Sequence, residues 1–475
     1  MNRNQLSWPI LAMFFCAALA GCGGTGQFGS QTQNNGNSSV VLAMTDTPPS
    51  TVSILSAEVT LTGATLSPGN VSLFSGSTTV ELTRLQTDIA YIATAANIPA
   101  GSFTSMTLTF ANPSLTIEND TASAIGTCAM GSICKMAPTT TANLSTTVPL
   151  TAFTIASASA TGLLIDVNLD NLLNATLGAD FTAGTTVTQF TPAGSAAPPV
   201  GAEDVVGHVA SVNASSNTFT LTNAMGSYSL KVDNTSTFFQ FPNSACSSPG
   251  FACLKNNQIL SVDIGIQSDG SILGRNILFE DADSSDVEVE GIVTNTASQQ
   301  FSIVVLAASS SGTGLTIGMP ATVQYSTSPP TPFDIDFVHI NNQLVGTSTF
   351  SSSFSGAADL AAGQQVSIRR NSSSTSTIVA DRVRLRSSRI TANVQSVGAP
   401  TITLASLPSL FFGHGGVAQI VAQTSVNPPT IYYEINGSVS AGTNILGDLV
   451  SVRGPLFNTG GINRTLVATK VVVKP

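Results

Sequence analysis

An internal repeat constrains this fold more than any other feature of the sequence. After residue 202 the same order of short apolar runs occurs three times, and each copy opens with a run that contains a small residue. The opening runs are residues 206–209, 290–293 and 391–394; the second runs are 218–221, 301–304 and 401–404; the later runs are 258–262, 364–368 and 448–452; the closing runs are 276–279, 382–385 and 470–473. A recurring order of elements indicates one structural unit used repeatedly.

Each copy is predicted to be a small, strongly bent β-barrel of the OB type. We interpret each copy, of which four runs are given above, as a five-strand unit. Gly207 and Gly291 in the first two opening runs would relieve the sharp curvature of a small barrel. The third copy carries Ala392 at that place. We predict the three repeats at 203–283, 286–387 and 389–475.

The segment before the repeats has the pattern of half-buried strands. Apolar and polar residues alternate in short runs, as in residues 162–169, and a stretch rich in Pro, Gly and Ala at 191–202 closes the segment. Several such strands within residues 40–197 predict a two-sheet sandwich of the Ig or prealbumin type. With β-branched residues plentiful and only 9% of residues charged, the whole chain is predicted to be all-β.

Two uncharacterised families resemble parts of this chain. The opening residues 40–48 (VVLAMTDTP), the run 98–103 (IPAGSF) and the strand 164–168 (LIDVN) resemble domain-of-unknown-function family 4382. That resemblance implies a β-sandwich at the N-terminus of an envelope lipoprotein, with no known activity. The repeats resemble domain-of-unknown-function family 5666, most closely at 206–279, where Asp269 and Gly270 form the turn before the last strand.

The N-terminus has the three parts of a lipoprotein signal peptide. Arg3 lies in a short polar region, residues 10–20 are apolar, and Leu19, Ala20 and Gly21 precede Cys22 as a lipobox. We predict a signal peptide at 1–21, lipidation of Cys22 and a flexible tether at 22–39, which is rich in Gly, Ser, Thr, Asn and Gln. Some lipoprotein families carry an aspartate directly after the lipidated cysteine, and that aspartate retains them in the inner membrane. This chain has Gly23 at that place. Its resemblance to lipoproteins therefore implies the outer membrane, on the periplasmic or the surface face.

Four further cysteines form two local pairs. Cys128 with Cys134 and Cys246 with Cys253 are each separated by a few residues that include Gly or Pro. In an exported protein this spacing predicts structural disulfides that close small loops. A redox or zinc site would need Cys-x-x-Cys spacing or nearby histidines, and neither occurs.

The charge balance disfavours nucleic acid as a partner. The chain has 16 Lys and Arg against 26 Asp and Glu, a formal net charge of −10. Nucleic-acid binding relies on clustered cations that neutralise phosphates. The sequence indicates the membrane, reached through the N-terminal lipid, as a partner, and a glycan or another envelope protein is considered below.

Two charged stretches are candidate sites. The acidic run from Glu280 to Glu290 supplies oxygen ligands, so a Ca²⁺ site at Asp281, Asp283 and Asp286 is weighed against a solvated linker. Arg382, Arg384 and Arg386 alternate along one strand face. We interpret them as a register device that pairs with Asp286, Glu288 and Glu290 on a neighbouring strand, or alternatively as a stripe that binds a polyanion.

Catalytic constellations are weak. The three histidines, His208, His339 and His414, lie far apart, and no Gly-x-Ser-x-Gly nucleophile motif occurs. The acid pairs Asp334 with Asp336 and Asp166 with Asp170 are what any solvated sheet face shows. We therefore predict no enzyme activity, no catalytic residues and no cofactor other than the Ca²⁺ considered above.

The sequence thus favours a non-catalytic, lipid-anchored envelope protein that binds a glycan or another envelope protein through its β modules. Such modules commonly present loops and sheet faces to ligands. A structural spacer or stalk without a specific ligand is the first alternative, and a surface hydrolase of glycans or esters is the second. The oligomeric state stays open.

Overall fold

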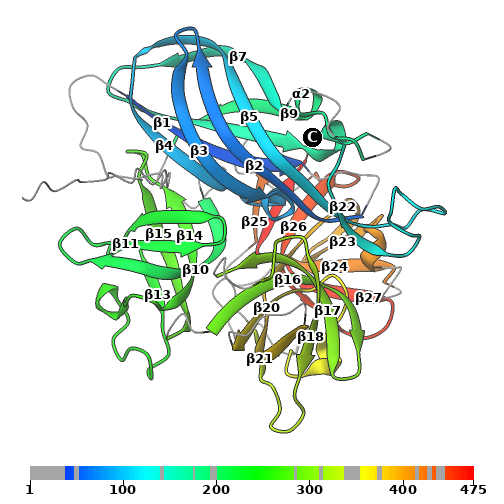
Figure 1. Cartoon of the computed structure of the whole chain (residues 1–475). Helices are drawn as coiled ribbons and strands as arrows, with labels where there is room; N and C mark the ends of the chain where they lie inside the picture. Colours follow the sequence, from blue (N-terminus) through cyan, green and yellow to red (C-terminus); the bar gives the residue numbers. More distant parts are fainter. Residues whose placement is uncertain are drawn as a thin grey trace, which may run out of the picture.

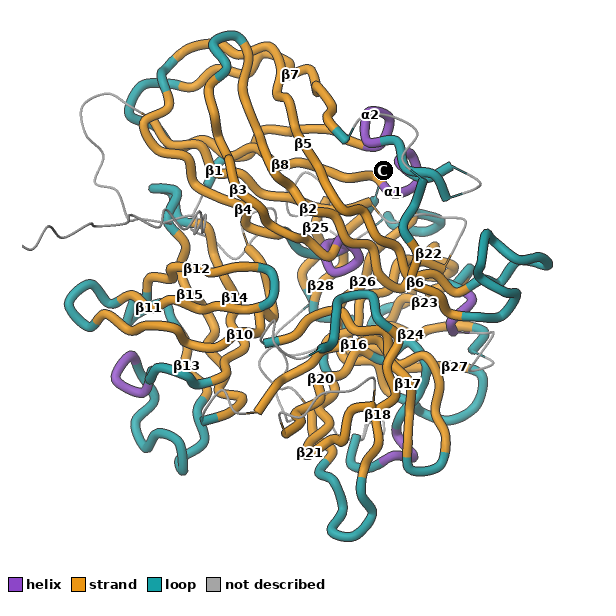
Figure 2. Tube along the Cα trace, viewed as in Figure 1, coloured by secondary structure: helices purple, strands orange, loops and turns teal. Residues whose placement is uncertain are grey.

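The fold is all-β, as predicted. The computed structural model describes residues 38–474 except 48–52, 140–143, 175–176, 193–200, 283–285, 310–313, 336–353, 372–376, 412–416, 425–429 and 435–443. Figures 1 and 2 show strands throughout, with a few short helices between them. The predicted lipidation site Cys22 and most of the predicted tether lie outside the described residues, whereas Ser38 and Ser39, which we assigned to the tether, begin the first strand.

The N-terminal unit consists of two facing sheets. One has the order β4-β1-β8-β9, with β1 and β8 parallel; the other has the order β3-β2-β5-β6, and β7 pairs with β5. The strands are β1 (Ser38–Thr47), β2 (Ser53–Ser67), β3 (Val71–Glu81), β4 (Ala90–Ile98), β5 (Gly101–Glu118), β6 (Ile133–Met136), β7 (Ser145–Ile155), β8 (Ala160–Asn168) and β9 (Thr185–Phe190). The short helices are η1 (Leu82–Gln86), α1 (Leu169–Leu172) and α2 (Phe181–Gly184).

The core of this unit follows the predicted alternation. Ile165 and Val167 on β8 are fully buried between the sheets, while Asp166 and Asn168 are half-buried. The opposite face of the same sheet is also covered, because Val41 and Leu164 pack into the core of the following barrel. This double burial explains the unbroken apolar run at residues 40–44 of β1.

The three repeats share one strand topology. Each repeat has five main strands, and the first three form an antiparallel meander. The first main strand also pairs with the fourth, and the fourth pairs with the fifth. The third pairs with the fifth in parallel, which closes the barrel. Barrel 1 contains β10 (Gly201–Asn213), β11 (Thr218–Asn223), β12 (Gly226–Lys231), β13 (Phe238–Gln240), η2 (Phe251–Cys253), β14 (Ile259–Ile266) and β15 (Ile272–Asp281). Barrel 2 contains β16 (Asp286–Ala297), β17 (Gln300–Ala308), β18 (Pro320–Tyr325), β19 (Phe333–Ile335), η4 (Ala357–Asp359), β20 (Gln365–Asn371) and β21 (Thr377–Leu385). Barrel 3 contains β22 (Ser387–Gly398), β23 (Thr401–Ala405), β24 (Gln419–Gln423), β25 (Ile431–Glu434), β26 (Leu449–Phe457), β27 (Asn463–Val467) and β28 (Lys470–Val473).

Two features of the barrels were not predicted. Each barrel has a sixth, short strand, namely β13, β19 or β25, which pairs in parallel with the closing strand. In barrel 3 the closing strand is divided into β27 and β28, and β26 pairs with both. Gly454 on β26 lies so close to the backbone of Val467 that a Cβ atom could not be accommodated there. The third repeat therefore closes by a locally different route.

The four units gather around a common centre and do not form a row. In Figure 1 the sandwich lies above, barrel 1 lies to the lower left, barrels 2 and 3 lie to the lower right, and the C-terminus returns to the sandwich. Among the described residues, no helix is long and apolar enough to cross a membrane.

Candidate functional site: a buried charged junction

Both predicted disulfides are formed. Cys128 pairs with Cys134 and Cys246 with Cys253, and in each pair the two Cα atoms are 5.8 Å apart. Each closes a short loop, at β6 of the sandwich and at η2 of barrel 1. Their role as structural clips agrees with the local spacing that predicted them.

The acidic run does not assemble a metal site within the described part of the chain. Asp281 Oδ2 lies 2.8 Å from the Arg369 guanidinium, and Asp286 Oδ2 lies 4.0 Å from the same group. Asp283 lies outside the described residues. In the part of the chain that the structure describes, no three His, Cys, Asp or Glu side chains are grouped to hold a metal ion.

The arginine stripe is buried and already neutralised. Arg382 Nη2 lies 2.7 Å from Glu280 Oε2 and 3.2 Å from Glu288 Oε2. The expectation that the acidic and basic strands are neighbours is wrong, because β20 lies between β16 and β21. Ser367 of β20 is in register with both Glu290 and Arg384, and its small side chain leaves room for long side chains on this face.

The stripe therefore belongs to an internal network. Arg386, between β21 and β22, is 1% exposed, and its guanidinium lies 3.1 Å from Glu280 of barrel 1 and 3.1 Å from Glu290 of barrel 2. Arg384 bridges Glu280 at 2.6 Å and Asp334 at 2.8 Å. A polyanion-binding role would require guanidinium groups facing solvent, whereas Arg382 and Arg386 face carboxylates of the chain itself.

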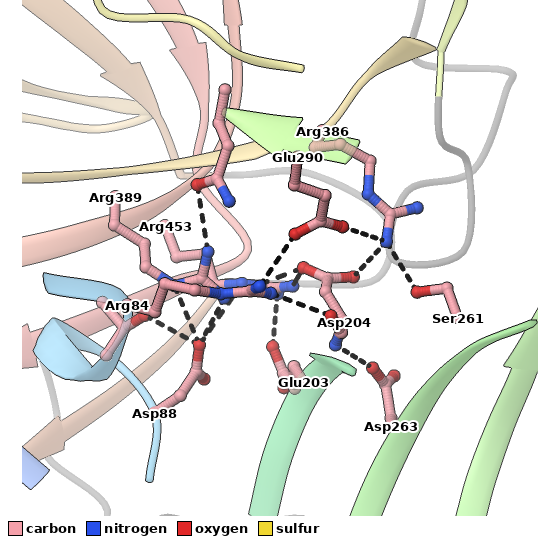
Figure 3. Close-up of polar contacts among 12 residues, drawn as sticks. Arg84, Asp88, Glu203, Asp204, Ser261, Asp263, Glu290, Arg386, Arg389 and Arg453 are labelled. Carbon is pink, nitrogen blue, oxygen red and sulfur yellow. Dashed lines mark hydrogen bonds and ion pairs between the residues drawn. The ribbon is translucent and has the colours of Figure 1, made fainter. Parts of the chain in front are cut away.

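The network extends to all four units, and we call its centre the charged junction. Figure 3 shows its acid side chains converging on a group of guanidiniums. The sandwich contributes Arg84 from η1 and Asp88 from the loop after it. The charged junction consists of Arg84, Asp88, Glu203, Asp204, Glu280, Glu290, Arg386, Arg389, Arg453 and Lys470.

Asp88 connects the sandwich to barrel 3. Its carboxylate lies 2.7 Å from Arg389 on β22 and 2.7 Å from Lys470 on β28. Burial by itself raises the pKa of Asp88, but the positive charges of Lys470, Arg389 and Arg453 outweigh it, so the pKa lies well below its ordinary value. Asp88 is therefore a carboxylate at neutral pH, and it holds two units together electrostatically.

Asp204 connects barrel 1 to the other units. A bulge in β10 between Ala202 and Val205 gives Asp204 a φ of 57°, in the left-handed region that Asp tolerates better than most residues. Its backbone N donates to Asp263 at 3.0 Å, its carbonyl accepts from Arg84 at 2.8 Å, and its carboxylate pairs with Arg453. The bulge directs three polar groups of one residue toward three partners.

Arg84 links the sandwich to barrel 2. Its Nη1 lies 2.9 Å from Glu290 Oε2, and its side chain is 9% exposed. Breaking a buried pair of this kind costs about 3–5 kcal/mol, because an uncompensated charge stays behind, although the intact pair contributes little net stability. The charged junction consists of acidic and basic side chains that neutralise one another, and these ion pairs fix the orientation of the four units relative to one another.

Two cavities flank the charged junction, and both are lined by Arg84 and Arg389. One, of about 100 Å³, lies where the sandwich meets barrels 2 and 3, among Leu55, Ile292 and Phe411. The other, of about 50 Å³, lies between the sandwich and barrel 1. Both are large enough for several ordered waters. The two guanidiniums already contact protein carboxylates, so neither cavity presents an uncompensated charge to a ligand.

The remaining candidate residues do not converge. His208 Nδ1 lies 3.3 Å from the carbonyl oxygen of Ser309, and His339, His414 and Asp336 lie outside the described residues. Asp334 pairs with Arg384. Asp166 is half-buried on β8, whereas Asp170 is exposed on α1.

A second feature lies on the outer side of the sandwich and consists of hydroxyl groups. The four stretches 60–67, 71–79, 101–112 and 145–155 contain no charged residue. Ser72, Thr65, Thr107 and Thr147 are in register across four neighbouring strands, and the Oγ1 atoms of Thr107 and Thr147 are 3.0 Å apart. We call this surface the hydroxyl face; it comprises Thr62, Thr65, Ser72, Ser102, Thr104, Thr107, Thr109, Ser145, Thr147, Thr151 and Thr154.

Sequence reasoning found part of the charged junction and missed the rest. The pattern indicated the alternating Glu and Arg residues, but it did not indicate Arg84, Asp88, Glu203, Asp204, Arg453 and Lys470. A usable signal was present: Arg453 and Lys470 stand within or beside apolar strand runs, and a charge in such a run indicates a buried, paired group.

Comparison with known families and with curated proteins found no match. What the fold itself defines is an all-β protein of several units, stapled by two local disulfides and joined at a buried charged centre.

Proposed function

We propose that this chain is a non-catalytic, lipid-anchored envelope protein that binds a neutral glycan through the hydroxyl face of its sandwich. The observation that carries the proposal is the in-register row of Ser72, Thr65, Thr107 and Thr147 on a surface without charge. Neighbouring strands are about 4.8 Å apart, so the row offers regularly spaced donors and acceptors to a chain of sugar hydroxyls.

A glycan suits this surface better than a protein partner does. Protein interfaces are enriched in aromatic residues, Met and Arg at their centre and are depleted in Ser. The hydroxyl face has the opposite composition. The charged junction supports the same proposal, because it holds the sandwich in one orientation on a compact head, whereas a spacer needs only length.

The anchor rests on the sequence alone. The lipobox at residues 19–22 and the polar segment that follows it support attachment through Cys22, with the described units held clear of the membrane surface. Outer-membrane placement, on either face, is part of the proposal, as is the absence of a cofactor.

Saturation binding tests the proposal. Labelled protein spanning residues 23–475 is titrated onto a panel of neutral and acidic polysaccharides and onto purified envelope proteins, with and without Ca²⁺. We expect saturable binding to a neutral glycan that does not depend on Ca²⁺. Thr107→Lys should reduce affinity at least tenfold, because it places a long charged side chain in the centre of the row.

Ser216→Lys is the matched control, since Ser216 is an exposed residue of barrel 1 far along the chain from the hydroxyl face. Equal losses in both variants would contradict the assignment of the surface. Binding to an envelope protein alone would replace the glycan proposal, and a flat signal throughout would favour the spacer.

A further inference from the structure

The end of the chain is inserted against the first strand of the sandwich. The backbone N of Lys474 donates to the carbonyl oxygen of Leu449 at 2.9 Å, which fixes the residue on barrel 3. Its side chain leaves that barrel, and Nζ donates to the main-chain oxygen of Asp46 at 3.3 Å. In Figure 1 the C-terminus lies beside the sandwich. Residues 428 positions apart are thus in direct contact.

Both residues in this contact are removed from water. Asp46 is 0% exposed and Lys474 is 5% exposed. Neither carboxylate oxygen of Asp46 has a hydrogen-bond partner among the described residues. A buried, charged carboxylate without partners is expensive, and in the charged junction the same chain gives every such group short contacts to cations. Asp46 therefore differs from the acids of the charged junction, each of which lies beside a cation.

Burial favours the uncharged forms of both groups. It raises the pKa of the Asp46 carboxyl despite the nearby Lys474, and the charges of Asp166, Glu81 and Asp170 act in the same direction. Burial also lowers the pKa of the Lys474 amine against the pull of Asp46 and Asp166. A desolvated neutral lysine is a nucleophile, and a neutral carboxylic acid is a better acyl donor than a carboxylate.

We propose that the Lys474 side chain forms an intramolecular amide bond with the side chain of Asp46. The Nζ lone pair attacks Asp46 Cγ, the new N–C bond forms, and the C–OH bond breaks. The hydroxyl leaves with a proton from Nζ as one molecule of water, so the step needs no oxidant or other co-reactant. Nζ already contacts the main-chain oxygen of Asp46, so its approach to Cγ requires rotation of side chains and no movement of a strand.

The bond would close the fold covalently. It joins β1 of the sandwich to the residue that follows β28, so all four units lie within one covalent ring. Cross-links between distant residues stabilise a protein by restricting its unfolded chain. This inference is independent of the glycan proposal, and either can fail without the other.

Intact-mass spectrometry of the reduced protein spanning residues 23–475 tests the bond. We expect a mass lower than that of the sequence by one water. Proteolysis should release a branched peptide that joins the segment around Asp46 to the C-terminal segment. A protein with the full sequence mass and no branched peptide overturns the proposal, because Asp46 and Lys474 are then an ordinary buried pair.

Variants identify the atoms involved. Lys474→Arg and Asp46→Ala should each restore the full mass, and Asp46→Asn should lose ammonia in place of water. Lys255→Arg, at an exposed lysine, should keep the deficit of one water. A deficit that persists in Lys474→Arg would place the lost water elsewhere and would also overturn the proposal. The measurement on the unmodified sequence stands even if a variant fails to fold.

Discussion

Glu280 shows how much a single residue contributes to this structure. Its side chain is fully buried and accepts hydrogen bonds from Arg382 at 2.7 Å, Arg384 at 2.6 Å and Arg386 at 3.1 Å. Burial raises the pKa of Glu280, but the three guanidiniums together outweigh it and hold the pKa below its ordinary value. One carboxylate at the end of barrel 1 thus neutralises cations at the end of barrel 2.

Glu280→Gln should strongly destabilise the protein. The amide keeps the shape of the side chain but leaves three arginines with one negative charge fewer, and a broken buried pair costs about 3–5 kcal/mol. Chemical denaturation followed by fluorescence measures the loss. The control is Asp381→Asn on β21, the strand that carries Arg382 and Arg384; its side chain is exposed and the change should stay within about 0.5 kcal/mol. Similar losses in both variants would show that Glu280 has no special role.

At the scale of elements, the opening strands of barrels 1 and 2 need a glycine at one position, because the second strand approaches the opening strand closely there. A Cβ atom on Gly207 would lie 2.7 Å from the carbonyl oxygen of Thr222, and one on Gly291 would lie 2.7 Å from that of Val304. The sequence suggested that these glycines relieve curvature. The structure adds a second reason, which is the close approach of a neighbouring backbone that cannot move away.

Gly291→Ala should therefore cost about 1–3 kcal/mol, as expected for an added methyl group in a filled space. Gly398→Ala is the matched change on the opening strand of barrel 3, where nothing lies within 4 Å of the added atom. We expect that control to be neutral or to stabilise slightly, because alanine restricts the unfolded chain. Thermal unfolding of both variants decides the matter, and a neutral Gly291→Ala would refute the steric explanation.

At the scale of the whole molecule, the units are joined by charge as well as by apolar packing. Asp88 of the sandwich holds Arg389 and Lys470 of barrel 3, and Arg84 of the sandwich holds Glu290 of barrel 2. These ion pairs depend on ionised carboxylates. The arrangement of the units should consequently depend on pH.

Acid should weaken the whole assembly through Asp88. Its pKa is lowered in the folded protein, so its contribution to stability is present above the unfolded value of about 4 and is lost as the pH falls toward the folded value. Calorimetry between pH 7 and pH 2 should show that Asp88→Asn melts at a lower temperature at neutral pH. The difference in melting temperature between Asp88→Asn and the unmodified protein should become smaller in acid.

Asp120→Asn, at an exposed aspartate near β5, should follow the unmodified protein at every pH. Parallel curves for Asp88→Asn and the unmodified protein, with a constant gap, would contradict the linkage between Asp88 and acid stability.

The all-β class, the two local disulfides and the recurring order of the five main strands in the repeats follow from the sequence alone. These depend on short-range patterns, since alternation places side chains on two faces and a loop of a few residues keeps two cysteines close. Which charges meet depends on how the four units pack against one another. Arg386 reaches Glu280 and Glu290, and Lys474 reaches Asp46, because packing four units brings together residues from strands that share no local pattern. Arg382 and Arg386, which the alternating pattern placed on an exposed strand face, are buried, and Arg384 is half-buried. All three pair with carboxylates, because charged groups removed from water must find partners.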